Sequence, residues 1–109
     1  MKKLSVLVSA LTFSAACNAG GWSGELTVTN TFTEAITDTI AVYTTGGIVY
    51  SPGCAANAWI IPADTTARAN RAYATIMTAL ATGKKIRFWY QDACSLWTYH
   101  GGSSVMLVN

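Results

Sequence analysis

The clearest periodicity in the chain is a helical pattern that follows Pro62 and ends at Gly83. Its apolar residues recur at intervals of four, three and four, which places them on one side of a helix: Ala69, Tyr73, Ile76 and Leu80. Asp64 or Thr65 is positioned to cap the first free amides. Gly83 suits the left-handed residue that follows the last turn. We therefore predict one amphipathic helix whose apolar face covers a core.

The other faces of this helix carry Arg68, Arg71 and Thr75. A solvated surface is the ordinary interpretation of such residues. A second interpretation is that they line a subunit interface or a pore. These three residues are therefore the candidate interface positions.

Alternation of apolar and polar residues predicts short strands on both sides of the helix. Three strands precede it, over residues 26–32, 39–45 and 57–62, and residues 48–50 are expected to extend the sheet. Two strands follow it, over residues 84–91 and 105–108. In the fourth strand one set of side chains is expected to face inward (Ile86, Phe88 and Tyr90) and the other outward (Arg87, Trp89 and Gln91).

The order of these elements predicts a mostly β fold with one α-helix, arranged β-β-β-α-β-β. Short mixed strands with a helix between the third and the fourth are typical of a small OB-fold-like Greek-key barrel. No repeat or low-complexity linker interrupts residues 20–109, so we expect a single domain there.

Residues 1–19 are typical of an export signal rather than of folded structure. Lys2 and Lys3 precede an apolar run over residues 4–16, which is too short to span a membrane. Cys17 and Ala19 are small residues at the two positions that a signal peptidase reads, so we expect cleavage after Ala19. The expected destination is secreted or periplasmic, with no transmembrane segment in the mature chain. The alternative is a lipoprotein acylated at Cys17.

Cleavage changes the charge of the chain. The formal net charge of +2 comes from Lys2 and Lys3, and the 90 residues left after removing 19 from 109 carry five basic and five acidic side chains. A neutral domain with so few charges is a poor nucleic-acid binder. It also has little repulsion to keep it monomeric. We expect no nucleic-acid partner and a homo-oligomer.

Cys54 and Cys94 are the cysteines that remain after cleavage. Two remaining cysteines in an exported chain predict a disulfide bond between them. It would close a loop of about 40 residues and contribute roughly 4 kcal/mol in the chain-entropy model. Two cysteines and His100 match no known zinc-ligand spacing, so we predict neither a metal site nor a cofactor.

Aromatic residues beside polar side chains are the candidate ligand-binding residues. The apolar C–H face of a sugar stacks on Trp or Tyr, while polar groups at the rim orient the ring. Trp89 with Arg87 and Gln91 forms one candidate set, and Trp97 with Tyr99 forms a second. The alternative is that the tryptophans fill a small core.

The sequence offers little that is typical of an enzyme. His100 has no nucleophile partner in sequence, and Glu25 and Asp92 are isolated acids. No paired-carboxylate, Ser-His-Asp or phosphate-loop pattern is present. We therefore expect a surface or hydrogen-bonded loop histidine and no catalytic residue.

Short motifs spread over residues 20–109 carry a resemblance to a known family. They are Gly21-Trp22-Ser23-Gly24-Glu25, Cys54 followed by Trp59, Thr82-Gly83, Ile86-Arg87 and Trp97-Thr98-Tyr99. On these residues the chain resembles the B subunits of subtilase cytotoxin and pertussis-like toxins, which are OB-fold subunits of AB5 assemblies. The resemblance implies a secreted subunit that forms a five-membered ring, binds cell-surface glycans and carries a separate catalytic chain.

The chain also departs from that family near its mature start. The toxin subunits have a longer loop before the first strand, where polar residues contact the sugar. Here Glu25 leads directly into the strand, so Ser23 and Glu25 are the only candidate contacts that can be carried over. We accordingly consider two functions. The first is an exported glycan-binding module like a toxin B subunit, and the alternative is a free-standing periplasmic interaction or inhibitor protein on the same fold.

Overall fold

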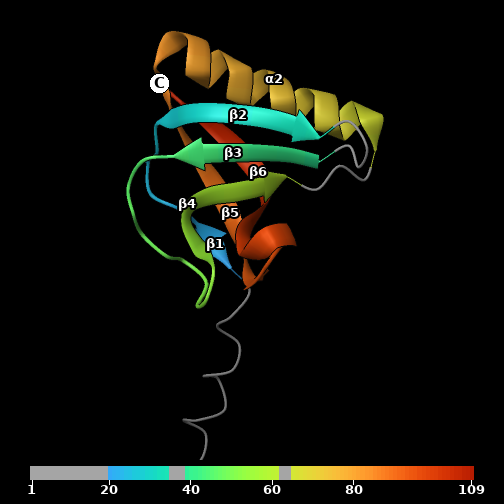
Figure 1. Cartoon of the computed structure of the whole chain (residues 1–109). Coiled ribbons are helices and arrows are strands. Elements are labelled where there is room, and N and C mark those ends of the chain that lie inside the picture. The colour runs from blue at the N-terminus through green and yellow to red at the C-terminus, as the bar shows by residue number, and fades with distance from the viewer. Residues whose placement is uncertain (1–19, 35–38, 62–64) are drawn as a thin grey trace, which may run out of the picture.

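The computed structural model describes residues 20–34, 39–61 and 65–109, so the expected signal segment and Asp64 lie outside the described residues. The described chain contains six strands, one α-helix and one 3-10 turn (Figure 1). In chain order they are β1 (Gly21–Trp22), β2 (Val28–Glu34), β3 (Thr39–Thr44), β4 (Ala55–Ile61), α2 (Thr66–Thr82), β5 (Lys85–Cys94), η2 (Leu96–Thr98) and β6 (Tyr99–Val108).

The six strands form one sheet in the order β1-β5-β6-β4-β3-β2. Neighbouring strands are antiparallel except for β4 and β6, which are parallel. β1 and β2 belong to the same N-terminal stretch, yet they pair with β5 and β3 at opposite ends of this order. Leu26, which lies just before β2, forms an antiparallel bridge with Ile86 of β5. This bridge joins the two ends of the strand order, so the sheet closes into a barrel. The predicted OB-fold-like Greek-key barrel, mostly β with one α-helix, is confirmed. The predicted order differs in one respect, because the two-residue strand β1 precedes the three strands expected before the helix.

Both ends of α2 follow from local sequence. Thr65 Oγ1 accepts a hydrogen bond from the backbone N–H of Arg68 at 3.1 Å, which confirms Thr65 as the cap. Gly83 adopts the left-handed conformation with φ of 76°, and its N–H donates to the carbonyl of Ala79 at 2.8 Å. The glycine stop is therefore also confirmed.

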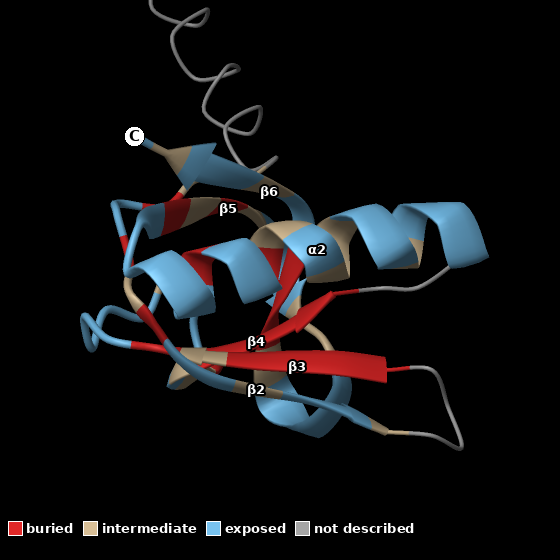
Figure 2. Cartoon of the chain, turned by 90° about the horizontal axis from the view of Figure 1, so that it is seen from above, coloured by how far each residue is buried: buried red, intermediate tan, exposed pale blue. Residues whose placement is uncertain are grey.

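The buried face of α2 is rotated slightly from the predicted one. The helix lies along the barrel and contacts β6, β2, β3 and β5 (Figure 2). Its core contacts come from Ala69, Ala72, Tyr73, Ile76 and Ala79. Leu80 is 36% exposed, so its predicted core position is wrong. The buried residue after Ile76 on this face of the helix is Ala79, three positions further on, so Leu80 lies at the edge of the contact with the barrel.

The core is centred on Trp59 of β4 and Phe88 of β5, whose ring centroids lie 4.5 Å apart in a stacked arrangement. Both side chains are almost completely buried. Ile86 and Phe88 are buried, as predicted for the inward set of this strand, whereas Tyr90 is half-buried. The other buried members of the core are Leu26, Val28, Ile40, Val42, Ile61, Ile76 and Ala79.

Two strand predictions are wrong. The last strand does not start at Val105, because β6 begins at Tyr99 and runs through a pair of glycines. A Cβ atom at Gly102 would lie only 2.9 Å from Cδ1 of Phe88, so this glycine makes room for a core ring instead of ending a strand. Residues 48–50 form no strand, and the side chains of Ile48 and Val49 are exposed.

Cys54 and Cys94 form the predicted disulfide, with their Cα atoms 5.4 Å apart. The bond joins the residue before β4 to the last residue of β5. It therefore fixes the loop at residues 50–53 against the β5 end of the barrel. Among the described residues, no helix is long and apolar enough to cross a membrane.

Candidate functional site

Four aromatic side chains from three parts of the chain meet on the outside of the barrel. We call this group the aromatic surface; it consists of Phe32, Tyr43, Trp97 and Tyr99. The Phe32 ring lies between those of Trp97 and Tyr43, stacked on each at a centroid distance of 6.1 Å. Tyr99 meets Trp97 and Tyr43 edge-on, at 5.6 and 5.8 Å. Phe32 is 40% exposed and Trp97 is 43% exposed, so the surface offers apolar ring area to solvent.

The backbone that carries Trp97 is held in an unusual conformation. Trp97 and Thr98 have φ values of 58° and 59°, in the left-handed region that non-glycine residues seldom adopt. Consecutive residues of this kind are energetically costly and need support from surrounding contacts. The N–H of Ser95 supplies part of that support, since it donates to the carbonyl of Tyr99 at 2.6 Å and closes the turn. The turn thereby presents the Trp97 ring to Phe32.

A hydroxyl pair lies beside the exposed rings. The phenol oxygens of Tyr43 and Tyr99 are 2.7 Å apart. This hydrogen bond raises the pKa of Tyr43, and burial raises it further. The phenol of Tyr43 is therefore neutral over the physiological range. The site thus combines apolar rings with a fixed pair of hydroxyl groups.

Trp89 belongs to a separate cluster with Trp22 and Arg87. The two indole rings meet edge-on at a centroid distance of 5.5 Å, and Cζ of Arg87 lies 6.0 Å from the centroid of Trp22. Arg87 Nε also donates to the carbonyl of Ser23 at 2.8 Å. Both Trp89 and Arg87 are half-buried. Much of the predicted Trp89–Arg87 face is therefore used in contacts that hold β1 against β5.

Ser23 and Glu25 lie in different environments although they are two residues apart. The Ser23 side chain is fully buried, where its hydroxyl donates to the carbonyl of Gly24 at 2.8 Å and accepts from the N–H of Phe88 at 3.0 Å. Ser23 therefore stabilises barrel closure and is not exposed to a ligand in this structure. Glu25 is exposed. Neither residue lies in the aromatic surface.

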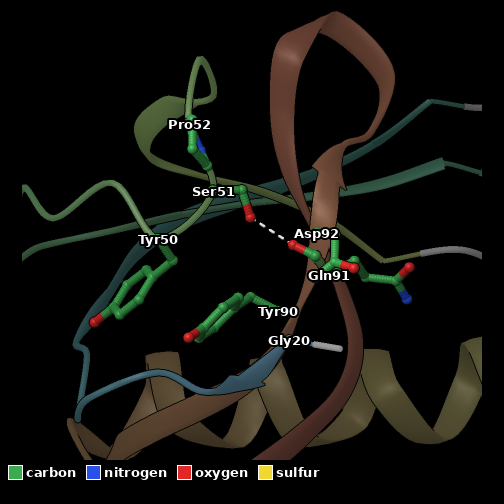
Figure 3. Close-up of a pocket in the computed structure, with 7 residues that line it drawn as sticks. All are labelled: Gly20, Tyr50, Ser51, Pro52, Tyr90, Gln91 and Asp92. Carbon is green, nitrogen blue, oxygen red and sulfur yellow. Dashed lines mark hydrogen bonds between the residues drawn. The ribbon is translucent and has the colours of Figure 1, made fainter. Parts of the chain in front are cut away.

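Gln91 lies at a cavity instead of beside Trp89. The cavity has a volume of about 280 Å³ and is lined by Gly20, Tyr50, Ser51, Pro52, Tyr90, Gln91 and Asp92 (Figure 3). The three side chains predicted to face outward from β5 therefore do not form one surface. Trp89 and Arg87 pack against β1, while the side chain of Gln91 is exposed.

His100 is a buried structural residue of β6. Its Nε2 accepts a hydrogen bond from the N–H of Tyr50 at 3.0 Å, and Nδ1 lies 3.4 Å from the carbonyl of Ala58. Because the Tyr50 amide can only donate, the ring proton belongs on Nδ1. Burial lowers the pKa of His100, against a smaller opposing effect of backbone hydrogen bonds to Ala58 and Ala55. Of the two predicted alternatives, the hydrogen-bonded role is confirmed and the surface position is wrong; the residue lies in a strand and not in a loop.

The candidate interface residues lie on α2. Arg68 and Arg71 are exposed, and Thr75 is half-buried with its hydroxyl donating to the carbonyl of Arg71 at 3.1 Å. Within the described part of the chain, no group of three or more His, Cys, Asp or Glu residues is arranged to hold a metal ion.

Phe32 is a residue of the aromatic surface that sequence reasoning did not select. Simple alternation from Leu26 and Val28 would place Phe32 on the same inward face. The pairing of β2 with β3 shifts between Val28 and Asn30, which is the signature of a bulge. Beyond this shift Phe32 faces outward and is exposed. The sequence carries no recognisable signal for the bulge. Tyr43 is a second residue of the aromatic surface that the sequence pattern does not single out.

Neither protein-family models nor curated proteins give a match to this chain. The functional assignment therefore depends on the chemistry of the side chains described above.

Proposed function

We propose that the chain is an exported carbohydrate-binding module whose ligand stacks on the aromatic surface. The observation that carries this proposal is the exposure of the stacked rings of Trp97 and Phe32. The apolar face of a pyranose ring packs well on flat aromatic side chains. The Tyr43 and Tyr99 hydroxyl groups are close enough to the rings to take part in orienting such a ligand.

Rigidity of the surface also supports binding. A ligand loses less affinity to ordering when the side chains it meets are already held in place. Trp97 is held by the closed turn at Ser95 and by its contacts with Phe32 and Tyr99. Strained backbone at an exposed tryptophan is a recurring property of functional sites. Together these features favour a binding role over a purely structural one.

Export is the second part of the proposal. The sequence of residues 1–19 supports it, as does the disulfide between Cys54 and Cys94, because such bonds persist mainly in oxidising compartments. Cleavage after Ala19 would leave residues 20–109 as the working module. The destination that we propose is the periplasm or the exterior of the cell.

The third part of the proposal is assembly into a ring like that of the toxin B subunits. β2 pairs with β3 on one edge, and no described strand pairs along its other edge. One side of β6 pairs with β5, and its other side pairs with β4 only as far as Gly101. An exposed strand edge is either protected or used for pairing, and a head-to-tail contact between two different edges can close a ring. A separate catalytic chain would then be the partner of that ring.

A glycan array of the purified protein tests the binding proposal. Trp97→Ala should remove the signal of every glycan that binds, whereas Trp97→Phe should retain part of it because a stacking face remains. Leu96→Ala is the matched control, since Leu96 is a similarly exposed neighbour without a ring. Undiminished binding by Trp97→Ala, or the absence of any bound glycan, would contradict the proposal.

A further inference from the structure

The cavity beside β5, whose lining is drawn in Figure 3, shares no lining residue with the aromatic surface. We infer that it is a second binding site, which takes an uncharged pyranose or a similarly sized polyhydroxylated ligand. Its volume of about 280 Å³ is near the lower limit for small-molecule pockets, which suits a ligand of monosaccharide size.

The walls of the cavity are fixed by cross-links. The hydroxyl of Ser51 donates to the carbonyl of Gln91 at 2.5 Å, and the nearby Cys54–Cys94 bond joins the same two segments. The N–H of Tyr50 is held by His100, and the hydroxyl of Tyr50 accepts from the N–H of Gly24 at 3.0 Å. The cavity therefore exists before any ligand arrives, which reduces the entropic cost of binding.

Gly20 is a lining residue that packs closely against the backbone of β5. A Cβ atom at this position would lie 2.0 Å from the carbonyl oxygen of Tyr90, and the residue has a φ of 90°. Both facts require glycine here. A glycine thus lets the chain lie directly against the Tyr90 carbonyl, which fixes this side of the cavity.

The chemistry of the lining points to hydroxyl groups on the ligand. The rings of Tyr50 and Tyr90 stack on each other with centroids 5.0 Å apart, so they give an apolar wall and not an aromatic cage around a cation. Within the described part of the chain, the Asp92 carboxylate has no hydrogen-bond or ion-pair partner, and the residue is exposed. A carboxylate accepts from two neighbouring hydroxyl groups.

The charge of the lining favours a neutral ligand. Asp92 carries the single side-chain charge among the seven lining residues, and it disfavours an anionic sugar. Cleavage after Ala19, if it occurs as proposed above, would add the α-ammonium group of Gly20 to this wall. The lining would then be neutral overall, so that neither a net anion nor a net cation would be preferred.

Two-dimensional ¹H–¹⁵N NMR of the purified protein, titrated with neutral methyl pyranosides, tests this inference. The expected result is saturable shifts at the amides of Ser51, Gln91 and Asp92, with a dissociation constant of about 1 mM or tighter. Asp92→Ala should weaken binding by about tenfold, as expected for the loss of a hydrogen bond to a charged group. Glu25→Ala is the matched control, because it removes an exposed carboxylate outside the lining, and it should leave the affinity unchanged.

The outcomes separate this site from the aromatic surface. Trp97→Ala should leave the shifts at Ser51 and Asp92 intact, whether or not the aromatic surface binds glycans. Shifts confined to Trp97 and its neighbours would overturn the second site and leave the first proposal standing. Tighter binding of choline or N-acetylneuraminic acid than of any neutral pyranoside would also overturn it, as would equal losses in Asp92→Ala and Glu25→Ala.

Discussion

The phenol oxygens of Tyr43 and Tyr99 lie 2.7 Å apart, and their hydrogen bond joins β3 to β6. These two strands are not neighbours in the sheet. β4 separates these strands in the sheet order. The hydrogen bond therefore lies outside the strand ladder and fixes the turn that presents Trp97 relative to β2 and β3. This relationship makes the aromatic surface a property of the tertiary fold.

Removing either hydroxyl should lower stability by a measurable amount. Tyr43→Phe and Tyr99→Phe are each expected to reduce the free energy of unfolding by about 1 kcal/mol, the usual net value of one hydrogen bond. The double variant should cost little more than either single one, because both remove the same interaction. Urea unfolding measures these values. Tyr73→Phe is the control, since the half-buried Tyr73 hydroxyl has no partner among the described residues. Additive losses in the double variant would contradict a shared bond.

Tryptophan substitutions should rank by burial. Trp59→Ala is expected to cost about 3–5 kcal/mol, because the side chain is 1% exposed and stacks on Phe88. Trp89→Ala should cost about 1 kcal/mol, mainly through its edge-on contact with Trp22. Chemical denaturation of the two variants gives the comparison. Unfolding of Trp89→Ala to the same extent as Trp59→Ala would show that Trp89 is a core residue.

Intact-mass measurement of the exported protein tests processing and redox state together. We expect the mass of residues 20–109 less two hydrogens, which corresponds to cleavage after Ala19 and one disulfide. Reduction should restore the two hydrogens and free both Cys54 and Cys94 for alkylation. A mass that includes Met1, or two free thiols in the native protein, would contradict the prediction.

The stability of the protein should depend on pH through His100. Burial lowers the folded-state pKa of His100 below its ordinary value of 6.5. As the pH falls through that value, the unfolded chain therefore binds a proton before the folded chain does. The free energy of unfolding should then decrease with falling pH and level off once the pH is below the folded-state pKa.

Urea midpoints at about pH 7.5 and about pH 5.5 measure this effect, in a range where histidine is the side chain that ordinarily titrates. His100→Gln should reduce the difference between the two midpoints, whatever its own stability, because His100 is the single histidine of the chain. An equal difference in the wild-type protein and this variant would refute a role for His100.

Light scattering coupled to size exclusion tests the ring. The expected mass is about five times that of the mature chain, in line with closed head-to-tail assembly. Arg71→Glu on the exposed face of α2 should lower that mass if the helix lies at the subunit contact, whereas Ile48→Glu in an exposed loop should not. A monomer at micromolar concentration in both low and moderate salt would exclude the ring and favour the free-standing alternative.

Features with local causes could be predicted from the sequence. Thr65 and Gly83 mark the ends of α2 because a cap and a left-handed stop each depend on one residue and its own backbone. The alternation at Ile86 and Phe88 identified the inward face of β5 for the same reason. The order of these local elements was enough to indicate the barrel.

Features that depend on distant contacts could not be predicted in this way. Gly102 looks like a strand break until the Phe88 ring is seen to occupy the place of its missing side chain. Phe32 looks like a core residue until the bulge in β2 turns it outward. Trp97 and Tyr99 are predicted together as a candidate set, but Phe32 and Tyr43, which complete the aromatic surface, come from strands far away in sequence. The cavity beside Gln91 depends likewise on a loop held against β5 by a disulfide.

The pairing of Trp22 with Trp89 has a consequence for the order in which the molecule forms. A residue near the start of the described chain needs a partner that is synthesised after the whole of α2. The contact between β1 and β5 cannot form while β2, β3 and β4 are being synthesised, because β5 follows them in the chain. Pairing between segments so distant in sequence is also slow. Completion of the fold therefore belongs to the last stage of synthesis. If the chain is exported as we propose, late completion of the fold would keep it unfolded while it crosses the membrane.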